Sequence, residues 1–89
     1  MSKKLKYITM DQYLSLGKMG RELYDYWTKF LPRMSQSLAE KGEFWESLKS
    51  EAETLDQVYE NWIAAGYEDY EAAEEPRQMM METPPEPGT

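Results

Sequence analysis

The sequence predicts an all-α protein, built as a small helical hairpin or three-helix bundle with a Pro-kinked first helix and a disordered C-terminal tail. Two apolar stripes predict the helical arms, because their residues recur every three or four positions, the spacing of one helix face. Gly42 and Gly66 stand where the two stripes end, as the left-handed residue after a helix commonly does. With 89 residues there is room for one small domain, which we expect over residues 9–75.

The first helix is predicted to begin at Met10, because Thr9 and Gln12 have the spacing of a capping box. Residues 1–8 before it are expected to be a flexible basic N-terminus. Pro32 interrupts the helical pattern, but the apolar stripe keeps one face across it, so we expect a kink there rather than two separate helices. The stripe consists of Leu16, Met19, Leu23, Trp27, Phe30, Met34 and Leu38.

The second helix is predicted from Glu43 to the residue before Gly66, with Tyr67 contacting Trp62 as in a Schellman motif. A short acidic helix should follow over residues 68–75 and stop at Pro76. The apolar face of the second helix consists of Phe44, Trp45, Leu48, Ala52, Leu55, Val58, Tyr59, Trp62 and Ile63. The opposite face is acidic and carries Glu46, Glu53, Asp56 and Glu60.

Residues 76–89 are predicted to form a disordered tail containing Pro and Met, because they hold four of the five prolines and lack a periodic apolar face. The chain contains no apolar run long enough for a membrane span and no recognisable export signal. The absence of Cys fits a reducing compartment. We therefore expect a cytoplasmic protein with no membrane partner.

The charge is divided unequally along the chain. Residues 1–39 carry seven Lys or Arg and three Asp or Glu, whereas residues 40–75 carry twelve acids and only Lys41 and Lys49 as bases. The formal net charges of the two parts are +4 and −10. This polarity can be satisfied within one fold, between two copies of the chain, or by a basic partner.

The residue types argue against catalysis. The chain has no His and no Cys, the residues used most in acid–base catalysis, nucleophilic catalysis and transition-metal sites. It also has no glycine-rich phosphate loop, no Glu-x-x-His motif and no calcium-binding loop. We expect a protein that is not an enzyme and that has no cofactor and no metal site.

The acidic part of the chain is the predicted contact surface for a basic protein, such as a nucleic-acid-handling complex, which the chain would block sterically and electrostatically. In such a contact the acids steer the encounter and the aromatic residues supply affinity. Direct binding of nucleic acid is not expected, since the basic cluster is confined to Lys3, Lys4 and Lys6. The predicted contact residues are Trp45, Glu46, Glu53, Tyr59, Glu60, Tyr67, Asp69 and Tyr70.

Three alternatives stay open at this point. The chain can be a structural homo-oligomer, such as a homodimer, whose charged halves satisfy each other and whose twelve aromatic residues are all core. The acidic face can be a nucleic-acid mimic or an ordinary solvated face. Glu51 falls inside the apolar sector of the second helix, so it either extends to solvent at the sector edge, or pairs with a basic residue such as Arg33, or faces a partner's cation.

The chain also resembles a known family over roughly residues 20–75. The resemblance is carried by Tyr26, Trp27, Pro32, Leu38, Gly42, Leu48 and Ala52, and by Gly66 before an acidic segment. This layout is similar to that of short TnpV-like proteins of transposons, plasmids and phages. The resemblance implies a mobile-element or phage setting, where small acidic helical proteins commonly bind and block a host system. It assigns no activity to individual residues.

Overall fold

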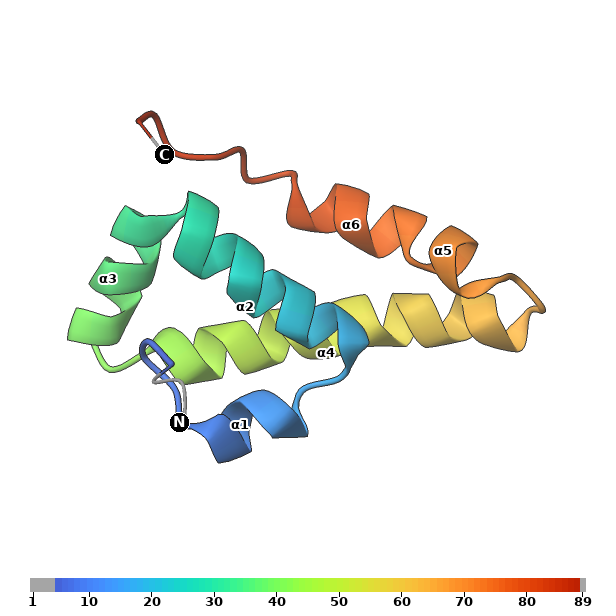
Figure 1. The fold of residues 1–89 in the computed structure, drawn as a ribbon, viewed down its shortest axis with the longest axis horizontal. Helices are drawn as coiled ribbons and strands as arrows, with labels where there is room; N and C mark the ends of the chain where they lie inside the picture. The colour runs from blue at the N-terminus through green and yellow to red at the C-terminus, as the bar shows by residue number, and fades with distance from the viewer. Residues whose placement is uncertain (1–4, 89) are drawn as a thin grey trace.

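The computed structural model describes residues 5–88, and every element of secondary structure in this range is helical (Figure 1). The 21-residue helix α4 forms the spine, α2 lies across it, and α1 and α6 lie on opposite sides of it in Figure 1. The elements are α1 (Met10–Ser15), α2 (Lys18–Phe30), α3 (Pro32–Glu40), α4 (Phe44–Ala64), α5 (Asp69–Ala72) and α6 (Glu74–Met80). The all-α prediction is confirmed.

The predicted start of the first helix is correct, but its length is wrong. Thr9 Oγ1 accepts from the Gln12 backbone N–H at 3.1 Å, and Gln12 Oε1 accepts from the Thr9 N–H at 2.9 Å, which completes the capping box. The helix ends at Ser15 because Leu16 is extended. A new helix, α2, begins after Gly17. The apolar stripe therefore continues across an interruption between two helices.

The predicted kink at Pro32 is also wrong, because two separate helices meet there and the chain changes direction (Figure 1). Leu31 has φ −127° and ψ 54°, outside the helical region, and its side chain is buried. Pro32 is the first residue of α3, a position where its missing N–H breaks no helical hydrogen bond. Buried Ser35 closes the corner by donating its hydroxyl to the Trp27 carbonyl at 2.9 Å.

Both glycine stops are confirmed. Gly42 has φ +72°, and the Glu43 N–H donates to the Leu38 carbonyl at 2.8 Å after α3. Gly66 has φ +98°, and the Tyr67 N–H donates to the Trp62 carbonyl at 3.2 Å after α4. These six-to-one bonds are those of a Schellman motif.

The core lies mainly between α2 and α4. Gly20 allows the two helices to approach closely, because a Cβ built there would lie 2.9 Å from Ala52 Cβ. Rings of Tyr24 and Trp27 pack edge-on against Phe44. The most deeply buried large apolar side chains are Met19, Leu23, Leu31, Leu48 and Leu55.

The predicted disordered tail is wrong, because α6 packs on the domain and the chain after it is held in place. Pro76 does not stop a helix; it lies in the first turn of α6, where its missing N–H is tolerated, and it is fully buried. Further on, Tyr26 donates its hydroxyl to the Thr83 carbonyl at 2.8 Å. Glu86 accepts from the N–H groups of Arg33 and Met34 at 2.8 and 2.9 Å and so caps α3.

The N-terminal segment is held in a similar way from Leu5 onward. The Tyr24 hydroxyl donates to the Lys6 carbonyl at 2.8 Å and accepts from the Lys6 N–H at 2.9 Å, while Ile8 is buried in the core. The remainder of the predicted flexible segment, residues 1–4, lies outside the described residues.

Candidate protein-binding surface

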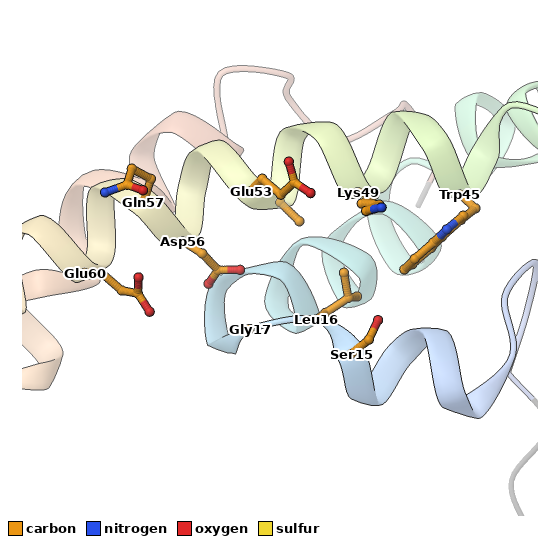
Figure 2. A pocket seen from close by; sticks show the side chains of 10 residues that line it. Ser15, Leu16, Gly17, Trp45, Lys49, Glu53, Asp56, Gln57 and Glu60 are labelled. Atoms are coloured by element: carbon orange, nitrogen blue, oxygen red, sulfur yellow. The ribbon is translucent and has the colours of Figure 1, made fainter.

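A hollow of about 380 Å³ separates α4 from the turn between α1 and α2 (Figure 2). One wall is formed by Ser15, Leu16 and Gly17 of that turn. The other wall belongs to α4, whose residues at intervals of three and four share one face. That wall is lined by Trp45, Lys49, Ala52, Glu53, Asp56, Gln57 and Glu60. We call this hollow the α4 groove.

Asp56 lines the α4 groove and contacts the start of α2. Figure 2 shows its side chain directed toward Gly17, and its Oδ1 accepts from the Met19 backbone N–H at 2.8 Å. The carboxylate therefore acts as the N-cap acceptor that Gly17 itself lacks, and it joins the start of α2 to α4. Helical periodicity predicted Asp56 on the outer acidic face, and this capping role was not predicted. One feature of the sequence could have indicated it: the helix starts after a glycine, which has no side chain to cap the helix.

The α4 groove brings together three of the predicted contact residues: Trp45, Glu53 and Glu60. Trp45 is half-buried, and Figure 2 shows its ring extending toward Leu16. Glu46 lines a shallower adjoining hollow together with Glu53. The ion pairs of residues 5–88 are Lys18–Asp69 and Arg77–Glu22, so these three glutamates take part in none of them.

Two other predicted contact residues, Tyr59 and Asp69, form a hydrogen bond with each other, and Asp69 also accepts a hydrogen bond from Lys18. The Tyr59 hydroxyl donates to Asp69 Oδ1, and Lys18 Nζ donates to Asp69 Oδ2 at 2.8 Å. The hydrogen bond from Lys18, followed by that from Tyr59, lowers the pKa of Asp69, while the same contacts raise the pKa values of Lys18 and Tyr59. This network joins α5 to α2, so its carboxylate already has a cation.

Tyr67 and Tyr70 lie beyond the end of α4 (Figure 1), and neither lines the α4 groove. Tyr67 packs edge-on against Trp62, as the Schellman prediction requires, and both rings are partly exposed. Tyr70 is more exposed, at 65%. Trp62 and Ile63 belong to the predicted apolar face of the second helix, and they are 36% and 40% exposed.

Glu51 lies on the surface and forms no ion pair with Arg33. Partial burial of its carboxyl group raises the pKa of Glu51, and the nearby negative charge of Glu82 raises it further. A contact between Glu51 and a partner's cation stays a prediction.

The arrangement offers charge and aromatic surface for binding. No group of three or more potential metal ligands occurs within residues 5–88. No helix in that range is long and apolar enough to cross a membrane. No protein-family model, curated protein or solved structure matches this chain. The resemblance to TnpV-like proteins stays a prediction.

Proposed function

We propose that this protein is a non-enzymatic interaction protein that docks the acidic face of α4 on a basic protein surface and blocks it. The observation that carries the proposal is the α4 groove, which Trp45 lines at one end, Glu60 at the other and Glu53 between them (Figure 2). The two glutamates take part in no ion pair of residues 5–88. Carboxylates at the rim of such a groove attract Lys and Arg side chains, and a half-buried Trp is a typical affinity anchor.

The blocked surface is proposed to belong to a nucleic-acid-handling complex of a host cell. Such complexes present the basic surfaces that an acidic protein recognises. The resemblance to TnpV-like proteins supports a mobile-element or phage setting. The mechanism needs no chemistry, because occupying the basic surface excludes its usual ligand.

The first test is affinity capture with the tagged protein from nuclease-treated lysate of its native host, at low and high salt. We expect one basic complex that is retained at low salt and lost at high salt, since salt screens exposed charges. The dissociation constant of the captured partner is then measured for the charge-reversed variant Glu53→Lys/Glu60→Lys. We expect binding to weaken by about tenfold or more.

A matched control tests whether a loss of binding results only from the change in net charge. Glu40→Lys/Glu82→Lys changes the formal charge by the same amount at two exposed glutamates outside the α4 groove. This control should bind within about threefold of wild type. If the groove variant binds as well as the control, the proposed surface is wrong.

The second candidate function is a structural homo-oligomer, favoured by the exposed apolar side chains at the end of α4. Trp62, Ile63 and Tyr67 would supply an apolar contact between copies. Light scattering after gel filtration separates the two functions: a doubled mass that persists across salt concentrations supports the oligomer. A monomer at all salt concentrations supports docking on another protein.

A further inference from the structure

The end of α4 presents aromatic rings that the fold leaves uncovered. Trp62 follows Leu55 by seven residues, two helical turns, so both lie on the same face of α4. Leu55 is 1% exposed, whereas Trp62 is 36% exposed and all residues from 60 to 71 are exposed. The apolar face of α4 therefore continues beyond the helices that cover it.

A backbone turn brings the two rings at this end into contact. Trp62 and Tyr67 lie with centroids 4.9 Å apart and planes at 88°. The Tyr67 N–H donates to the Trp62 carbonyl, and Gly66 supplies the left-handed residue that this turn requires. The Schellman motif thus brings the two side chains into contact, and this contact restricts their rotamers before a ligand binds, which lowers the entropy cost of binding.

A hollow of about 190 Å³ opens beside these rings. Its lining combines two aromatic residues with three glutamates: Trp62, Tyr67, Glu71, Glu74 and Glu75. We call this hollow the aromatic tip. The residues between 50 and 76 include no Lys or Arg. The Lys–ring contacts within residues 5–88 are at Tyr59 and Phe30, so neither ring of the tip has an internal cation.

We infer that the aromatic tip binds the cationic end of a Lys or Arg side chain from a basic protein partner. An ammonium or guanidinium group is attracted to aromatic faces, and pairs of rings with adjacent carboxylates are the usual recognition device for organic cations. The rings alone balance the positive charge of the bound side chain only in part, and the lining carboxylates balance the rest. This inference rests on the proposed function, because it assigns a second contact to the same kind of partner.

A second copy of this chain is a poor occupant for the tip. Residues 59–75 carry six carboxylates and no base, so two tips in contact would bring like charges together. The same charge favours a basic partner at long range. The tip and the α4 groove are then two separate contacts for one basic surface.

The test uses the full-length protein and small probes. Trp27, Trp45 and Trp62 each give an indole N–H signal in a ¹H–¹⁵N spectrum, and Trp62→Phe assigns the signal of the tip. The probes are the acetylated methylamides of lysine and arginine, with that of norleucine as the uncharged analogue. We expect saturable shifts of the Trp62 signal with lysine or arginine and none with norleucine. Equal shifts with norleucine, or no saturable shift with either cation, would overturn the inference.

Variants separate ring recognition from general acidity. Tyr67→Ala should weaken cation binding about three- to tenfold, whereas Tyr67→Phe, which keeps the ring, should bind like wild type. Leu14→Ala is the control, because Leu14 lies in α1, is 57% exposed and does not line the tip. Unchanged binding by a folded Tyr67→Ala variant, checked by circular dichroism, would contradict the inference.

One more titration distinguishes failure of this inference from failure of the proposed function. With a mixed Lys/Arg peptide, shifts of both the Trp45 and Trp62 signals support the two contacts together. Shifts of Trp45 alone overturn the tip and leave the α4 groove standing. No shift of either signal at low salt overturns both.

Discussion

The contact between Gly17 and Asp56 gives the most direct test of how this fold is held together. Asp56→Ala removes the acceptor that lies 2.8 Å from the Met19 N–H. Losing an N-cap acceptor costs about 0.5–2 kcal/mol, and the partial burial of this bond favours the upper half of that range. For a domain of this size we expect a decrease in Tm of roughly 4–8 °C per kcal/mol.

Gly17→Ala should damage the same bond from the other side. The φ of Gly17 is −76°, which any residue adopts, but an added Cβ would lie 2.6 Å from Asp56 Oδ2. The carboxylate must therefore move, and Met19 loses its acceptor. Since both substitutions remove one interaction, the double variant should be more stable than additivity predicts by about 1 kcal/mol.

Urea unfolding followed by Trp fluorescence, with circular dichroism as a second probe, measures all four proteins of this cycle. Wild type, the two single variants and the double variant should share one m-value, because the surface exposed on unfolding changes little. Additive losses would refute the argument, since they would mean that Gly17 and Asp56 act independently. A negligible loss for Asp56→Ala would refute the capping role itself.

Two further predictions concern glutamates. Glu86→Gln should lower the free energy of unfolding by about 1 kcal/mol and speed amide exchange at Arg33 and Met34, because a carboxamide has one acceptor oxygen for two N–H donors; unchanged exchange would contradict the cap. Glu51→Gln should remove a pH-dependent loss of stability. The folded pKa of Glu51 is raised by burial and Glu82, so wild type loses stability as pH rises from 4.5 to that raised pKa. In urea titrations, the free energy of unfolding of the variant should exceed that of wild type by an amount that grows over this pH window, to about a few tenths of a kcal/mol, and then stays constant. A difference that is largest at the acid end would contradict this.

Features encoded within a few residues were predicted correctly from the sequence. The Thr9 capping box and the Gly42 and Gly66 stops involve partners no more than five positions apart, so their chemistry is visible in the local pattern. The breaks at Leu16 and Leu31 were missed because their caps come from distant residues. Asp56 caps α2 and Glu86 caps α3, and these pairs are 37 and 52 or more residues apart.

The candidate site was predicted in part, for a related reason. Helical periodicity assigned Trp45 to the apolar face of α4 and Glu53 and Glu60 to the opposite acidic face, whereas all three line the α4 groove. Periodicity does not show how far a neighbouring helix extends along that face. Trp62 lies on the predicted apolar face, yet no neighbouring helix covers it fully, and Asp69 was assigned to a partner although Lys18 reaches it.

The distribution of ion pairs bears on how the charge asymmetry of the chain is satisfied. Of the twelve acids in residues 40–75, Asp69 alone takes part in an ion pair within the described residues 5–88. Within the described residues, the fold therefore leaves most of this acidic part without ion pairs. A second copy would bring the +4 part of one chain against the −10 part of the other, which leaves a large excess of negative charge. A partner with an excess of Lys and Arg removes that excess, so electrostatics favours docking on a basic protein over self-association.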